Sequence, residues 1–133
     1  MSEAPSAALL LYVEDEVLIQ DVLVSSLTEA GYEVLAVTTA TEGINALQSR
    51  TGELRGLITD INLGSGPDGW DVAKQARELI VGLPVIYVSA ASHQEWTSKG
   101  VPESVMIAKP FAPAQIVVAI SALLNKAPHH EVI

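Results

Sequence analysis

The sequence predicts an α/β domain in which five parallel strands form one sheet between two layers of helices. Short apolar runs, typical of strands buried on both faces, alternate with longer segments in which apolar residues recur at helical spacing. Polar residues stand at the carboxyl ends of four of the five runs, where open parallel sheets bind ligands. Right-handed crossovers leave few topologies for such a chain, and we expect the strand order 2-1-3-4-5.

The first half of the chain contains two strand-helix units. We predict strands at 9–13 and 33–37 and helices at 17–30 and 41–48. Gly31 follows the first helix at the position where a residue in the left-handed conformation commonly ends a helix.

The second half contains three further strands, each followed by a helix. The predicted strands are 56–59, 84–88 and 104–108, and the predicted helices are 70–80, 92–98 and 113–125. Asp71 lies in the first turn of its helix, where the macrodipole favours an acid, and Ser92 to Glu95 matches a capping box. Pro113 suits the first position of the last helix.

Composition limits the classes of protein to which the chain can belong. Its 133 residues, 49% of them hydrophobic, are enough for a single domain with one core, which we place at about 9–125 with flexible ends at 1–6 and 127–133. The 7 basic residues against 16 acids give a net charge of −9, which argues against a direct nucleic-acid partner. Cysteine is absent, which excludes disulfides and thiolate chemistry.

The N-terminus shows no targeting or membrane signal. Residues 1–8 lack a basic region followed by a long apolar segment, and no run approaches the roughly 20 apolar residues that span a bilayer. We therefore expect a cytoplasmic protein with no membrane partner.

Three carboxylates are expected to meet at one edge of the sheet. Glu14 and Asp15 follow the first strand, and Asp60 follows the third, which is its neighbour in the expected order. Two like charges about 4 Å apart repel by roughly 4 kcal/mol at an effective dielectric constant of 20, so such a cluster requires a counter-charge. A divalent cation with a preference for oxygen ligands, such as Mg²⁺, would provide it.

Five short motifs carry a resemblance to a known family. They are Val-Glu-Asp-Glu at 13–16, Asp-Ile-Asn-Leu at 60–63, Asp-Gly-Trp at 68–70, Val-Ser-Ala at 88–90 and Lys-Pro-Phe at 109–111. Together and in this order they resemble the receiver domain of two-component response regulators, which is CheY-like and has the flavodoxin-like (βα)5 fold. The resemblance extends from about residue 9 to 125.

The resemblance implies a phosphorylation site. Asp60 would accept a phosphoryl group from the phosphohistidine of a sensor histidine kinase or a histidine phosphotransfer protein, and Ser89 and Lys109 would contact phosphoryl oxygens. The metal, Mg²⁺ or Mn²⁺, would be held by Glu14, Asp15, Asp60 and the backbone carbonyl of Asn62. Such a protein is not an enzyme in the usual sense, because it catalyses only its own phosphorylation and dephosphorylation.

Two features concern how the signal leaves the site. At Met106, three residues before the lysine, receivers commonly carry an aromatic residue that changes rotamer, and methionine has no ring. The relay is therefore expected through the backbone of 90–99 or through the fourth and fifth helices. The apolar residues of the last helix cannot all face one core, which indicates a homodimer or a contact with a downstream protein through those two helices; they are Val117, Val118, Ile120 and Leu123.

Other interpretations remain open at this point. The chain could be a receiver-like interaction module that is never phosphorylated, or a Mg²⁺-dependent phosphatase of the haloacid dehalogenase type, although the nucleophile of that class follows the first strand. A flavin carrier would need a phosphate-binding loop where this chain has three acids at 14–16. We expect a single-domain regulator, although a receiver excised from a hybrid kinase or a longer regulator would read the same.

Overall fold

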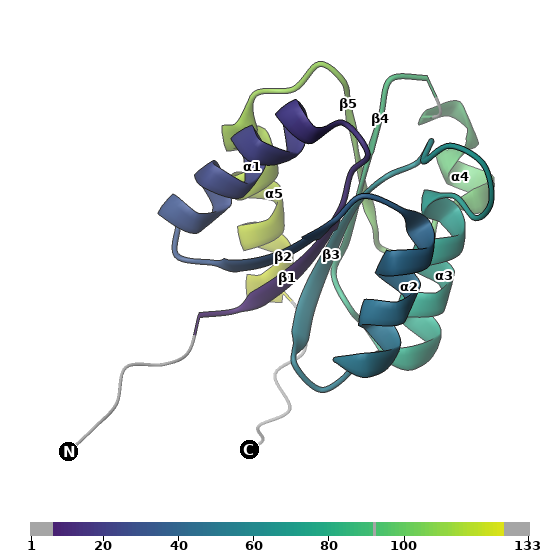
Figure 1. Cartoon of the computed structure of the whole chain (residues 1–133), viewed down its shortest axis with the longest axis horizontal. Helices are drawn as coiled ribbons and strands as arrows, with labels where there is room; N and C mark the ends of the chain where they lie inside the picture. Colours follow the sequence, from purple (N-terminus) through teal and green to yellow (C-terminus); the bar gives the residue numbers. More distant parts are fainter. Residues whose placement is uncertain (1–6, 92, 127–133) are drawn as a thin grey trace.

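The computed structural model describes residues 7–91 and 93–126 and contains one five-stranded parallel sheet (Figure 1). The order is β2-β1-β3-β4-β5, which confirms the predicted topology. The strands are β1 (Leu9–Val13), β2 (Glu33–Val37), β3 (Leu54–Asp60), β4 (Val85–Ser89) and β5 (Val105–Ala108).

Helices cover both faces of the sheet, with α1 and α5 on one face and α2 and α3 on the other (Figure 1). Their bounds are α1 (Val17–Glu29), α2 (Ala40–Ser49), α3 (Gly69–Leu79), α4 (Trp96–Lys99) and α5 (Pro113–Lys126). Alternation along β1 produces the two layers, because Leu10 and Tyr12 pack in the cluster with α1 and α5 while Leu11 and Val13 pack in the other. None of the helices in the described ranges is long and apolar enough to cross a membrane.

Most helix ends agree with the prediction. Gly31 has φ +100°, the left-handed conformation expected after α1. Asp71 and Asp68 form a reciprocal capping box at the start of α3, with N–H to carboxylate distances of 3.0 and 3.1 Å. The box fixes where α3 begins after the loop that follows Asp60.

The predicted fourth helix is present, but its first turn is a 3₁₀ helix. The 3₁₀ turn (His93–Glu95) is followed by the four-residue α4, which ends at Lys99, one residue after the predicted end. The segment has no apolar stripe to hold a longer helix, and Gly100 ends it with its N–H on the carbonyl of Trp96 at 2.8 Å. The expected capping residue Ser92 and the expected flexible ends, 1–6 and 127–133, lie outside the described residues.

The last helix divides its apolar residues as expected. Ile116 and Ile120 are buried, whereas Val118 is 67% exposed. This leaves apolar surface on α5, while the homodimer through helices four and five stays a prediction.

Gly69 lies directly against the backbone of the β3 end. Its N–H donates to the carbonyl of Ile61 at 2.8 Å, and a Cβ at this position would overlap the carbonyl oxygen of Asp60. The same Cβ would come within 2.8 Å of the Cα of Ile61. Only glycine lets α3 begin this close to Asp60.

Gly69→Ala is therefore expected to lower the free energy of unfolding by about 1–3 kcal/mol, because the backbone at 60–61 must shift to admit the methyl group. Urea unfolding measures the change. Gly52→Ala is the matched control, since a Cβ there has nothing within 4 Å. Equal effects of the two substitutions would contradict this account of the contact.

Candidate functional site

Glu14, Asp15 and Asp60 meet at the carboxyl edge of the sheet, as the sequence predicts. Val13 of β1 pairs with Thr59 of β3, so the residues after this pair lie side by side. One carboxylate oxygen from each of the three acids lies within 4.8 Å of the others. Glu14 and Asp60 are buried and Asp15 is exposed, so the cluster opens to solvent on one side.

Lys109 reaches into this cluster from the end of β5. Its Nζ lies 2.9 Å from Asp60 Oδ2, 3.0 Å from Glu16 Oε1 and 3.3 Å from Glu14 Oε2. The backbone N–H of Lys109 donates to the carbonyl of Ser89 at 2.9 Å, which continues the pairing of β4 and β5 past the strand end. The lysine is thus fixed at its backbone and at its amino group.

Burial and neighbouring charges shift the pKa values of both Glu14 and Lys109. Burial, followed by the charge of Asp60, raises the pKa of Glu14 to about 7. Burial alone would lower the pKa of Lys109, but its hydrogen bonds to Asp60 and Glu16 outweigh that effect and raise it. The lysine therefore stays cationic, while the site still holds more carboxylates than cations.

This donor set fits a hard divalent cation. Lys109 occupies one oxygen each of Asp60 and Glu14, and Asp15 and the remaining oxygens provide further ligands of the type that Mg²⁺ prefers. Because one lysine cannot neutralise all the carboxylates, a divalent ion would lower their mutual repulsion.

Ser89 and Asn62 lie at the same edge. Asp60 pairs with Val88, so Ser89 is one residue beyond the partner of Asp60; its side chain is buried and its Oγ accepts from the N–H of Ala91 at 3.1 Å. The backbone N–H of Asn62 donates to Asp60 Oδ1 at 3.3 Å, and Asn62 is exposed to solvent. All six predicted residues therefore lie at the same edge of the sheet, and their individual roles remain proposals.

Sequence reasoning missed three supporting contacts. Glu16 binds Lys109, Tyr12 donates through its hydroxyl to Glu14 Oε1 at 3.4 Å, and Gln20 donates to the backbone carbonyls of Glu14 and Val37 at 3.2 and 2.9 Å. A third acid in one short turn was the available signal for Glu16. The contacts of Gln20 depend on how α1 packs, which no local pattern shows.

Met106 has no aromatic ring, but its partner on the neighbouring strand does. It lies opposite Tyr87 of β4, whose ring is 4.7 Å from that of Trp70. The hydroxyl of Tyr87 accepts from the N–H of Val101 at 3.0 Å, beyond α4. The buried aromatic ring beside Met106 therefore belongs to Tyr87 of β4 and not to β5.

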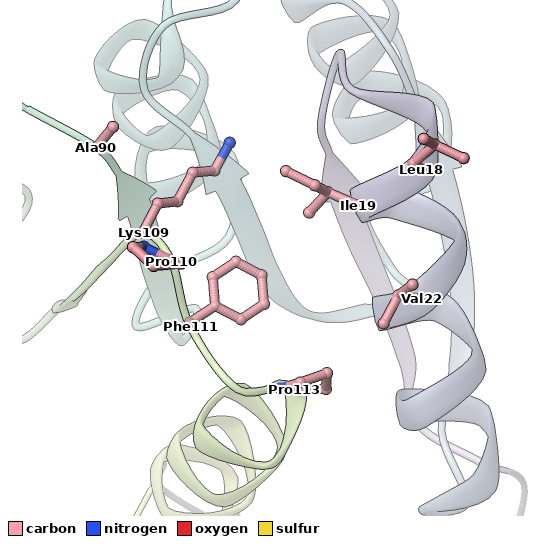
Figure 2. Close-up of a pocket in the computed structure, with 8 residues that line it drawn as sticks. All are labelled: Leu18, Ile19, Val22, Ala90, Lys109, Pro110, Phe111 and Pro113. Carbon is pink, nitrogen blue, oxygen red and sulfur yellow. The ribbon is translucent and has the colours of Figure 1, made fainter.

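An apolar groove of about 490 Å³ adjoins the site (Figure 2). Ile19 and Val22 of α1 line one side, and Lys109 and Phe111 line the other (Figure 2). Leu18 at the rim is 80% exposed. Lys109 therefore belongs both to the carboxylate cluster and to the groove.

The response regulator receiver domain family model matches residues 10–121, and the chain belongs to this family. It is 34% identical over 122 residues to the transcriptional regulatory protein CusR of Escherichia coli K12, covering 88% of this chain and 51% of CusR. The chain thus spans about half the length of that curated relative.

Solved structures agree on the fold. A response regulator receiver protein from Sinorhizobium medicae is 40% identical, with a TM-score of 0.86 over 90% of this chain and 95% of its own. The receiver domain of sensor histidine kinase PA1611 from Pseudomonas aeruginosa, described with a magnesium ion in its active-site cleft, is 20% identical with a TM-score of 0.74 over 90% and 98%. The latter similarity shows the fold alone.

The raised pKa of Glu14 predicts a pH-dependent stability in the absence of metal. Between the ordinary pKa of 4.5 and about 7 the folded state holds a proton that the unfolded state has lost, so stability falls as pH rises through this window. Glu14→Gln removes the cost of ionising a buried carboxyl next to Asp60. It is therefore expected to raise the free energy of unfolding at pH 8 by about 1–3 kcal/mol, with a smaller gain at pH 5.

Urea unfolding with a chelator present measures both values. Glu29→Gln, which removes the same charge from an exposed site on α1, is the control. A gain for Glu14→Gln that is equal at pH 5 and pH 8 would contradict the assignment.

Proposed function

We propose that this chain is a phosphoacceptor receiver in which Asp60 takes a phosphoryl group from the phosphohistidine of a sensor histidine kinase or histidine phosphotransfer protein. The observation that carries the proposal is a buried Asp60 that bonds to Lys109 at 2.9 Å and lies within 4.8 Å of two more acids. Clustered carboxylates with one lysine fit phosphoryl transfer, which depends on positioning and charge neutralisation.

The chemistry follows from the atoms at hand. A carboxylate oxygen of Asp60 forms the new O–P bond while the N–P bond of the donor breaks, and the electron pair stays on the imidazole nitrogen. Lys109 donates to one phosphoryl oxygen as a point charge, and the hydroxyl of Ser89 donates to another. The product is an aspartyl phosphate at the edge of the sheet.

Four residues would hold the metal ion: Glu14, Asp15, Asp60 and the backbone carbonyl of Asn62. Mg²⁺ or Mn²⁺ supplies charge neutralisation for the carboxylates and for the incoming phosphoryl oxygens. The donor set of three clustered carboxylates supports this proposal.

The surroundings of the site favour a protein as the phosphoryl donor. The apolar groove begins at Lys109 and continues along exposed apolar side chains of α1, including Leu18 (Figure 2). Contact with such a surface stabilises a protein complex but contributes nothing to a small anionic donor. We place the chain in the cytoplasm, where it signals by contact with a downstream protein.

Incubation with acetyl phosphate and Mg²⁺ tests the proposal. We expect about one acid-stable, alkali-labile phosphoryl group per chain in the wild type, and none in Asp60→Asn or without Mg²⁺. Asp68→Asn is a matched control, because Asp68 lies in the loop after β3 and caps α3 outside the cluster.

Two outcomes would favour the other interpretations. Continuous release of phosphate from many esters would indicate a phosphatase. A wild type that gains no phosphoryl group and shows no Mg²⁺-dependent change would indicate an interaction module.

A further inference from the structure

The amino group of Lys109 has no spare donor in this structure. A lysine ammonium carries three N–H donors, and Nζ contacts three carboxylates: Asp60 at 2.9 Å, Glu16 at 3.0 Å and Glu14 at 3.3 Å. Each donor therefore has one acceptor. A phosphoryl oxygen can bind Lys109 only if one of these three carboxylates gives up its place.

The three carboxylates differ in what their release would cost. Glu14 has no exposed surface, and its side chain also contacts the hydroxyl of Tyr12 and the N–H of Glu16, so water cannot replace the contact that it would lose on leaving Lys109. Asp60 is the phosphoryl acceptor itself, and its side chain is 7% exposed.

Glu16 differs from both because its side chain is 59% exposed. When it leaves Lys109, water can solvate its carboxylate at once, and an ion pair this exposed contributes little to stability. Glu16 is the N-cap residue of α1 but makes no side-chain cap hydrogen bond, so helix α1 does not depend on where this carboxylate lies.

We propose that Glu16 is a positioning residue that holds Lys109 in the unphosphorylated state and yields its place to a phosphoryl oxygen. It then competes with the phosphoryl group for the lysine and weakens binding of that group at Asp60. The inference rests on the proposed function, and it assigns a role to a residue outside the metal ligands and the phosphoryl contacts.

Beryllofluoride, which stands in for a phosphoryl group on a carboxylate, tests the competition by isothermal titration calorimetry at saturating Mg²⁺. Glu16→Gln is expected to tighten its binding about two- to fivefold, the range that fits an exposed ion pair. The gain is expected to shrink in 1 M salt, where exposed charges are screened within about 3 Å.

Two further variants separate the contact from the charge. Glu16→Asp keeps the charge but shortens the side chain, and an aspartate at an N-cap bonds to the helix backbone, so we expect it to behave like Glu16→Gln. Asp21→Asn removes one charge from an exposed position on the same helix, and we expect wild-type affinity.

Each alternative outcome is informative. Wild-type affinity in Glu16→Gln would overturn the competition while leaving the proposed function intact. A Glu16→Asp variant that matches the wild type, or an Asp21→Asn variant that gains as much as Glu16→Gln, would show that net charge alone is responsible. A wild type that binds no beryllofluoride would overturn the proposed function and this inference with it.

Discussion

The bond between Lys109 and the carboxylates around it is the interaction on which the rest of the site depends. Three acids on adjoining strand ends would repel one another strongly, and burial of Glu14 and Asp60 increases the cost. Lys109 joins the end of β5 to the ends of β1 and β3 and offsets part of this repulsion. The remaining negative charge at this edge is of the kind that a divalent cation would neutralise.

The fold restricts where Lys109 and Asp60 can lie. The order β2-β1-β3-β4-β5 puts β1 beside β3 and β5 at the edge, so Lys109 must cross the end of β4 to reach Asp60. Its backbone bond to Ser89 sets the start of that crossing. On the other side, Gly69 lets α3 pack against the carbonyl of Asp60, which fixes the backbone of this residue. Chemistry at this edge therefore depends on close packing as well as on charge.

The convergence of Glu14, Asp15 and Asp60 was predictable because the carboxyl ends of neighbouring parallel strands must meet. The start of β3 was not, because Arg55 and Gly56 interrupt its apolar run; the strand begins two residues before the predicted 56, and Gly56 lies against Leu10 and Ile120. The 3₁₀ form of the turn before α4 was not predictable, because it accompanies a tertiary contact: the indole of Trp96 bonds to Ser104 across the following turn at 2.8 Å. Contacts of Glu16 and Tyr12 depend on side-chain direction, which spacing does not show.

Locating the phosphoryl group within the chain tests the role of Asp60 directly. Borohydride reduces an aspartyl phosphate to homoserine, and tandem mass spectrometry of the digested, phosphorylated protein then identifies the modified residue. We expect homoserine at position 60, with Asp15 and the other acids unchanged. Homoserine at another aspartate, or none at all in a preparation that carries the phosphoryl label, would contradict it.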